Sequence, residues 1–290
     1  MALIAIQQIR RMRGGAQSHL LLASDNFMYV VKFSNNPQHV RVLANELLAT
    51  RLAAAVGLSV PHSDVIEVSE WLIRNTPELN IEMRGGPQAC QPGLHFASRW
   101  VGGLLPGLVM DYLPEGQLME VRNLGEFAGI LALDKWTCNI NGRQAVFQRT
   151  QRERRYRARF IDQGYCFHAG DWKFIDVSLG GVFAENSVYR GVTGWESFEP
   201  WLSRIENLEP GVAWAIAEMI PPEWYGGDLS ALEVLLEKLL ARRARVRELV
   251  VAFGESVRRP FPNWGGGRKE GLAGERGALG WVHDAGGRVG

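Results

Sequence analysis

The first hundred residues contain short apolar runs separated by turn residues, which is the pattern of β-strands. Strands are predicted at residues 2–9, 20–23, 27–33, 64–68, 70–74 and 95–100, with a loop at 85–93. Residues 37–56 instead repeat apolar side chains at helical spacing and end before Gly57, a residue typical of helix C-termini. The N-terminal part is therefore predicted to be an antiparallel sheet with one helix.

Helical spacing dominates the remainder of the chain, and one two-stranded ribbon interrupts it. Helices are predicted at residues 123–133, 195–207, 210–219 and 228–253, and the ribbon at 144–148 and 155–161. From residue 259 onward Gly and Arg are frequent, which is typical of a flexible tail. We predict an α+β fold with an N-terminal lobe over residues 1–100, a mostly helical lobe over 101–258 and a tail over 259–290.

Composition narrows the class of protein. The 290 residues are 46% hydrophobic, which is enough for the core of one two-lobed protein. Lys and Arg total 32 against 31 Asp and Glu, so no overall basic field favours nucleic acid as a partner. Three scattered cysteines fit neither a disulfide framework nor a zinc site, and a reducing cytoplasm is expected. No apolar run reaches the roughly 18 residues of a membrane span.

Three polar residues in the middle of the chain have the spacing of a phosphate-transfer site. Asp134 follows the predicted helix 123–133, Asn139 comes five residues later, and Asp162 ends the ribbon. In protein kinases the first such carboxylate accepts the proton of the attacking hydroxyl, and the other two residues hold Mg²⁺ against the phosphates of ATP. The spacing alone is common, and a turn-capping role is the alternative for Asp162.

Lys32 and Glu46 support this interpretation from upstream. Lys32 lies in an apolar strand, where a lysine needs either water or a partner anion. In kinases a strand lysine contacts the α- and β-phosphates and is held by a glutamate from the next helix. Lys32 and Glu46 have this order and these elements, although an edge-strand lysine is the alternative. Lys32, Glu46 and Asp134 are the predicted catalytic residues.

ATP is predicted to lie between a glycine turn and the last strand of the sheet. Gly14 and Gly15 let backbone N–H groups approach phosphate oxygens, although an ordinary turn is the alternative. The hinge that would bind adenine is placed near residues 98–102. The predicted cofactor-binding residues are Gly14, Gly15, Ala16, Gln17, Ser18, Lys32, Ser98, Arg99 and Trp100. The predicted metal-binding residues are Asn139 and Asp162.

Arginines alternate with apolar residues along the second strand of the ribbon. Arg155, Arg157 and Arg159 therefore share one face of the strand. Such a face binds acidic or phosphorylated partners in some proteins. The expectation for this ribbon is nevertheless a solvated face.

The chain resembles the HipA-like kinases in four segments. They read G-G-A-Q-S-H-L from Gly14 with Y-V-V-K-F from Tyr29, N-E-L-L-A from Asn45 with V-G-L-S-V-P from Val56, L-D-K-W-T-C-N from Leu133, and F-I-D-Q-G from Phe160. The similarity extends over about residues 8–250. It is greatest to compact bacterial members without an additional N-terminal subdomain.

This resemblance implies a two-lobed protein-kinase-like fold that transfers the γ-phosphate of ATP, with Mg²⁺, to Ser or Thr of a protein. It implies that Lys32 contacts phosphate, Glu46 positions Lys32, Asp134 is the base, and Asn139 and Asp162 bind Mg²⁺. An unidentified protein substrate and an inhibitory protein are the implied partners.

The chain also departs from eukaryotic-type kinases. Ala132-Leu133 replaces the His-Arg before the catalytic Asp, Gln163 replaces the Phe after the metal-binding Asp, and no A-P-E follows. Regulation by an activation loop of the usual kind is therefore not expected.

Two other functions stay open at this point. A small-molecule kinase of the aminoglycoside or choline type would share the lobes and the site. A nucleotide-binding pseudokinase, acting as a partner module, would bind ATP without turnover.

Overall fold

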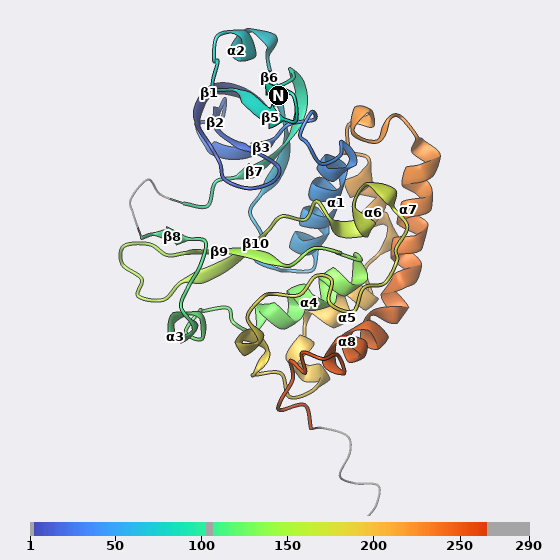
Figure 1. The fold of residues 1–290 in the computed structure, drawn as a ribbon. Coiled ribbons are helices and arrows are strands. Elements are labelled where there is room, and N and C mark those ends of the chain that lie inside the picture. Colours follow the sequence, from blue (N-terminus) through green and yellow to red (C-terminus); the bar gives the residue numbers. More distant parts are fainter. Residues whose placement is uncertain (1–2, 103–106, 266–290) are drawn as a thin grey trace, which may run out of the picture.

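The computed structural model describes residues 3–102 and 107–265. Its N-terminal part is a closed barrel of five strands (Figure 1). Around the barrel the strands are β1 (Leu3–Arg11), β2 (His19–Ala23), β3 (Met28–Lys32), β7 (Gly93–Arg99) and β4 (Ser63–Val68). Four neighbouring pairs are antiparallel, as expected. The barrel closes through a parallel pair, in which Leu3 lies opposite Ile66 and Ile4 opposite Glu67.

Alternate strand residues fill the barrel, because successive side chains point to opposite faces. The buried residues inside include Leu21, Ala23, Tyr29, Val31, Ile66 and Ala97. The pairing of β1 with β2 shifts register twice, between Ala5 and Gln7 and between Gln8 and Arg10. Such irregularities bend a strand, which lets β1 reach both β2 and β4. Lys32, at the end of β3, therefore has a rigid support.

The predicted strand at 70–74 is wrong, because these residues form the short helix α2 (Glu70–Arg74). Ser69 Oγ caps this helix by accepting a hydrogen bond from Leu72 N at 3.1 Å. Glu70 and Arg74 pair one turn apart on its surface. The expected loop at 85–93 contains β6 (Gly86–Ala89), which forms a hairpin with β5 (Asn80–Met83).

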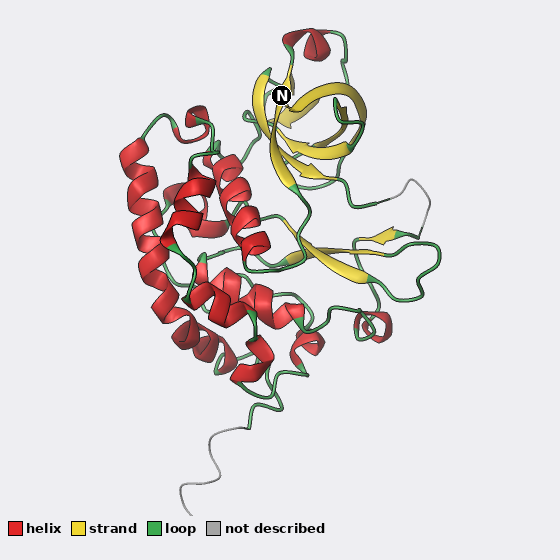
Figure 2. Ribbon diagram, turned by 180° about the vertical axis from the view of Figure 1, so that it is seen from behind, coloured by secondary structure: helices red, strands yellow, loops and turns green. Residues whose placement is uncertain are grey.

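The helix α1 (Arg41–Ala55) joins the barrel to the helical part of the protein. It is buried along most of its length, so it lacks a solvated face. Leu47, Leu48 and Leu52 belong to the same core as Leu131 and Trp136 from the second half of the chain. Figure 2 shows α1 packed among the other helices while the barrel lies beside them. Glu46 is therefore held by the helical core rather than by the barrel.

The second half begins with a small sheet and a buried helix. Its strands β8 (Val109–Met110), β9 (Gln144–Gln148) and β10 (Arg157–Ile161) form an antiparallel sheet, and α3 (Glu115–Leu118) precedes α4 (Glu126–Trp136). Ten of the eleven residues of α4 are buried. Trp136 Nε1 donates to Leu239 O at 2.8 Å, so this tryptophan packs against the helical lobe.

The remaining helices enclose α4. They are α5 (Trp201–Glu206), α6 (Pro210–Ala217), α7 (Leu229–Arg242) and α8 (Val246–Gly254). The single helix predicted at 228–253 is interrupted by a 3₁₀ turn at Arg243–Arg245. Arg242 Nε there donates to Lys135 O at 3.0 Å, which turns the chain so that α8 packs against α4.

The first residues of the predicted tail are packed. Phe261 and Trp264 stack on each other, and both contact the ring of Phe198. Residues 266–290 lie outside the described residues, so the flexible tail stays a prediction there. No helix within residues 3–102 and 107–265 is both long and apolar enough to cross a bilayer.

Candidate active site

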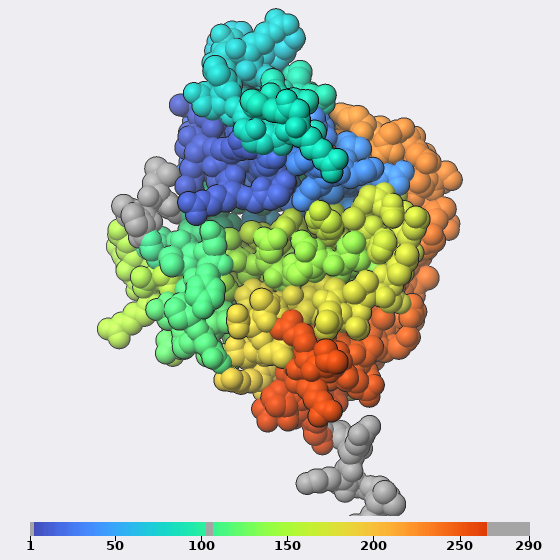
Figure 3. Space-filling model, in the orientation of Figure 1, coloured from blue at the N-terminus to red at the C-terminus, as the bar shows by residue number. Residues whose placement is uncertain are grey.

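A cavity of about 810 Å³ lies where the barrel meets the β8–β9–β10 sheet and α1. In the space-filling view the blue barrel rests on the green segments of this sheet (Figure 3). The glycine turn, the end of β3, the end of β7 and the ends of β9 and β10 all contribute to its wall. Elements far apart in the sequence therefore converge on one cleft.

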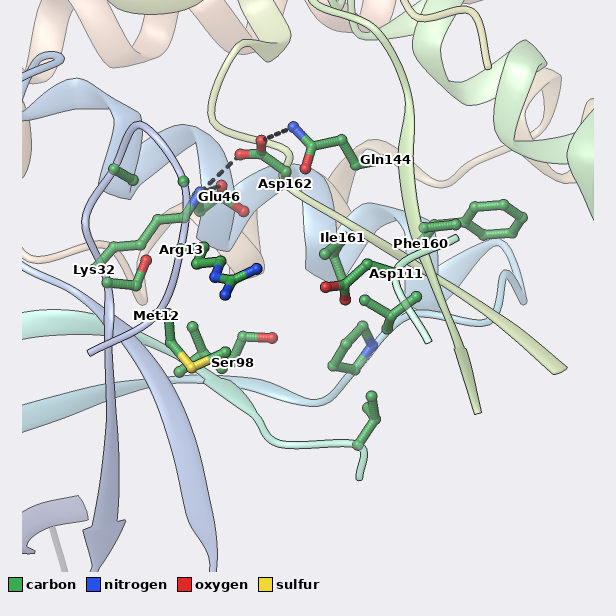
Figure 4. A pocket seen from close by; sticks show the side chains of 18 of the residues that line it. Met12, Arg13, Lys32, Glu46, Ser98, Asp111, Gln144, Phe160, Ile161 and Asp162 are labelled. Carbon is green, nitrogen blue, oxygen red and sulfur yellow. Dashed lines mark hydrogen bonds and ion pairs between the residues drawn. The ribbon is translucent and has the colours of Figure 1, made fainter. Parts of the chain in front are cut away.

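Lys32, Glu46 and Asp162 meet in this cleft (Figure 4). Lys32 Nζ donates to Asp162 Oδ1 at 2.8 Å and also to Glu46 Oε1. Burial lowers the pKa of Lys32, but the two carboxylates outweigh it and hold the pKa above its usual value. Burial raises the pKa of Asp162, but Lys32 outweighs it and holds this pKa below its usual value. Both side chains are therefore charged at neutral pH.

Asp162 has a left-handed backbone conformation, with φ of +64°. Aspartate tolerates this conformation better than most residues, and here it follows directly after the end of β10. The next residues return to α1, where Glu46 Oε2 accepts from Gln163 N at 3.0 Å and Oε1 accepts from Gly164 N at 2.9 Å. A Cβ on Gly164 would lie 2.5 Å from Val42 Cγ1, so only glycine allows this approach.

Asp134 does not lie in the cleft. Its side chain is fully buried, accepts from Arg143 Nε at 2.8 Å and from Arg143 Nη2, and accepts from Asn139 Nδ2 at 3.0 Å. A general base must reach the hydroxyl that it deprotonates. Neither Asp134 nor Asn139 lines the cleft, because α4 continues to Trp136 and Asp134 lies inside this buried helix instead of in the loop after it. The roles predicted for Asp134 as base and for Asn139 as metal ligand stay predictions.

Arg143 links the buried side chain of Asp134 to the backbone on either side of Asp162. Its side chain is 0% exposed. Besides Asp134, it donates to Ile161 O at 2.7 Å and to Gln163 Oε1 at 2.8 Å, which are the neighbours of Asp162 on either side. Asp134 and Arg143 therefore fix the backbone that presents Asp162. The sequence analysis missed Arg143, since nothing local distinguishes it from a surface arginine.

Gln144 lines the cleft beside Asp162 and bonds to its carboxylate. It begins β9 opposite Ile161, and its Nε2 donates to Asp162 Oδ2 at 2.5 Å (Figure 4). The sequence analysis missed it, because its position follows only from the register of β9 with β10. Gln144 takes the place beside Asp162 that was predicted for Asn139.

The predicted cofactor-binding residues divide into two groups. Those that line the cleft are Gly14, Gly15, Ala16, Ser18, Lys32, Ser98, Arg99 and Trp100. Gln17 turns away, because its Oε1 accepts from Glu82 N at 2.7 Å and its Nε2 donates to Glu82 O at 2.8 Å. The Arg99 and Trp100 N–H groups donate to His62 O and Met28 O, both at 2.8 Å, so neither is free for a ligand.

Asn45 fastens the segment after Asp162 to α1. Its Nδ2 lies 2.9, 3.0 and 2.9 Å from the carbonyl oxygens of Gly164, Cys166 and Ala169, and its Oδ1 accepts from Trp172 Nε1 at 2.8 Å. The segment bends sharply, since several of its residues are left-handed; they are Phe167, His168, Ala169, Trp172 and Phe174. Asn45 and Glu46 thus hold one segment from adjacent positions on one helix.

Comparison with known proteins shows which solved structures share this fold. The chain resembles the structure of hydra Fam20 with sugar, with a TM-score of 0.53 and 11% identity over 90% of this chain and 87% of that chain. Lower scores relate it to the Golgi casein kinase (0.49, 12% identity, 87% and 74% covered) and to the Helicobacter pylori proinflammatory kinase CtkA (0.44, 12% identity, 86% and 94% covered). No curated protein sequence matches significantly.

The fold is a two-lobed protein-kinase-like fold, as expected. Residues 5–122 match the family described as HipA-like kinase, which supports a kinase-type phosphotransferase. The resemblance to HipA-like kinases is therefore confirmed, over the barrel, α1 and the segment up to α4.

The buried ion pair of Asp134 and Arg143 gives a first prediction. Asp134→Asn leaves the charge of Arg143 uncompensated, so we expect the free energy of unfolding to fall by about 3 to 5 kcal/mol. The double variant Asp134→Leu with Arg143→Met replaces both charges by apolar groups and should recover most of this loss. Urea unfolding measures both. The exposed Asp171→Asn is the control. An Asp134→Asn protein as stable as the wild type contradicts the structural role.

Asn45 gives a second prediction. Asn45→Leu leaves three carbonyl groups and the Trp172 indole without a partner, so we expect stability to fall by about 3 kcal/mol or more. The buried thiol of Cys166 should then react faster with an alkylating reagent, as measured by peptide mass spectrometry. Asn75→Leu removes an exposed amide that bonds only Trp71 O, and it should change neither quantity. Unchanged Cys166 labelling in Asn45→Leu would refute this role.

Proposed function

We propose that the protein binds ATP with Mg²⁺ in the cleft and transfers the γ-phosphate to Ser or Thr of another protein. The observation that carries the proposal is the contact of Lys32 with both Glu46 and Asp162 at the wall of the cavity. Kinases hold the phosphates of ATP with such a set of one lysine and two carboxylates.

Each part of the cleft suits one part of ATP. Lys32 would contact the α- and β-phosphates, and Glu46 would orient it. The turn at Gly14 and Gly15 would cover the phosphates with backbone N–H groups. Gly14 has φ of +123°, which favours glycine at this turn. The apolar side chains of Val30, Pro61 and Ile161 line the same cavity and suit the faces of the base.

The residues beside Asp162 fit a magnesium ion. Mg²⁺ prefers oxygen ligands and takes one or two from a protein when phosphates and water supply the others. Asp162 offers a carboxylate and Gln144 an amide oxygen once its amide is rotated. The ion would neutralise charge on the transferring phosphate.

The remaining carboxylates of the cleft supply an alternative to Asp134 as base. Phosphate transfer depends mainly on positioning and charge, and one carboxylate near the acceptor hydroxyl is sufficient. Asp111 and Glu185 line the cleft without pairing to Lys32. Phe183, two residues before Glu185, bridges to Arg143, which places this segment beside Gln144. We assign the proton acceptor to Glu185.

A nucleotide-binding module without transfer is the second candidate. The burial of Asp134 favours it, because the described loop between α4 and β9 offers no other carboxylate. Mg·ATP should raise the melting temperature in either case. Incubation with γ-labelled ATP and a protein mixture, then with a metabolite mixture, separates the proposed kinase from this module and from a small-molecule kinase. An inhibitory protein partner stays a prediction.

Asp162 tests the proposal directly. We expect Asp162→Asn to lower the rate of transfer from labelled ATP by about a hundredfold or more, because the magnesium ion that would neutralise the phosphates loses its carboxylate ligand. We also expect the melting temperature to stop responding to Mg²⁺ in the presence of ATP. Gln144→Leu should raise the Mg²⁺ concentration needed for half-maximal transfer. Asp171→Asn, exposed and outside the cleft, is the matched control. Full transfer by Asp162→Asn would exclude the proposed chemistry.

Glu185 tests the assignment of the base. Glu185→Gln should lower kcat by about a hundredfold, the usual contribution of a positioned base, while the KM for ATP stays the same. Asp111→Asn is the matched control from the same cleft. Normal kcat in Glu185→Gln would rule out this role.

A further inference from the structure

A second cavity, of about 770 Å³, lies against the β8–β9–β10 sheet. In Figure 1 this sheet extends away from α7, toward the side opposite the long helices. The charged residues of its lining are five arginines and one glutamate: Arg122, Arg149, Arg152, Arg157, Arg159 and Glu153. The chain as a whole has a net charge of only +1, so this concentration of positive charge is local.

The strand period and the hairpin produce this arrangement. Along β10 the side chains of Ala158 and Phe160 are 0% exposed, so the alternate residues Arg157 and Arg159 face the other way. Arg149 and Arg152 come from the connection between β9 and β10. Arg122 joins them because its backbone N–H donates to Tyr156 O at 2.9 Å. The arginines therefore come from three segments.

Few carboxylates compensate these charges. Arg122 pairs with Glu153, which also accepts from Thr150 N and Oγ1 at 2.9 Å each. Among the described residues, Arg157 pairs only with Glu126, at 3.8 Å, and that carboxylate already accepts two hydrogen bonds from Ser59. Within the described part of the chain, no carboxylate lies within 4.0 Å of Arg152 or Arg159. The cavity is thus short of negative charge.

Arg159 is the least favourably placed of these groups. It is partly buried, and its pKa is lowered first by this burial and then by the neighbouring charge of Arg157. A partly desolvated guanidinium beside a second one gains more from an anion than an exposed arginine does. The cavity is therefore arranged for an anionic group.

The lining selects among anionic partners. Single-stranded nucleic acids need aromatic side chains on which bases stack. The lining contains no aromatic side chain, and the guanidinium of Arg149 lies 4.9 Å over the ring of Tyr156, which covers that ring. Guanidinium groups instead match the oxygens of a phosphate in pairs. We propose that this cavity binds a phosphorylated serine or threonine in a segment of another protein.

The two cavities adjoin each other. Val101 lines both of them. Gln144 of β9 and Asp162 after β10 lie in the first cavity, whereas Gln148 and Arg159 of the same strands lie in the second. A strand rises by about 3.3 Å per residue, so Arg159 and Asp162 are about 10 Å apart along the chain. A docked segment would lie beside the cleft. Its binding does not require the proposed transfer and can be measured without nucleotide.

The test is fluorescence anisotropy without ATP or Mg²⁺. The probe is a labelled degenerate peptide with a central phosphoserine, compared with the same peptide carrying serine or glutamate there. We expect the phosphorylated peptide to bind at least about tenfold more tightly than the serine peptide, and less tightly at high salt. The double variant Arg157→Gln with Arg159→Gln should lose this difference. Arg159→Lys, which keeps the charge but not the planar fork, should lose part of it.

The matched control also removes two positive charges. Arg74→Gln with Arg84→Gln changes exposed residues of the barrel region and should bind as the wild type does. Melting temperatures of all variants check that they are folded. Equal binding of the serine and phosphoserine peptides, unchanged binding in the Arg157 and Arg159 variant, or tighter binding of a single-stranded RNA of equal charge would each overturn the proposal. Loss of transfer in the kinase assay would leave these binding results unaffected.

Discussion

The geometry of the cleft depends on the buried ion pair of Asp134 and Arg143. Removing a guanidinium from water costs several kcal/mol unless its donors are satisfied. Here Asp134, Ile161 O and Gln163 Oε1 accept from it. Burial lowers the pKa of Arg143, but Asp134 outweighs it and raises the pKa above its usual value. Arg143 thus stays charged. Its donors need acceptors inside the protein, and two of these acceptors belong to Ile161 and Gln163, the neighbours of Asp162.

The same argument extends to α1. Glu46 accepts from Lys32 and from two backbone N–H groups after Asp162, while Asn45 binds three carbonyl groups further along. Left-handed residues cost on the order of 1 to 2 kcal/mol each, so this segment keeps its shape only through such contacts.

The sequence predicted the part of the site that follows from element type and order. Lys32 in a strand, Glu46 in the next helix and Asp162 at a strand end meet as expected. Asp134 lies inside α4 rather than in the loop predicted to carry it, because the helix continues to Trp136. Gln144 depends on strand register, and the closure of the barrel depends on two strands about sixty residues apart. Such long-range pairings leave no local pattern.

Net charge is a poor guide to what this protein binds. Net charge is a sum over the whole chain, here 32 basic and 31 acidic residues. The same sum results from an evenly mixed surface and from a surface with one concentrated patch of positive charge. The period of two along β10 gathers arginines on one face, and the hairpin adds others from its turn. The lining of the second cavity argues against nucleic acid there. Arg149 covers the ring of Tyr156, and the lining offers no aromatic surface on which a base could stack. Shape and side-chain chemistry, rather than total charge, therefore determine which anion fits.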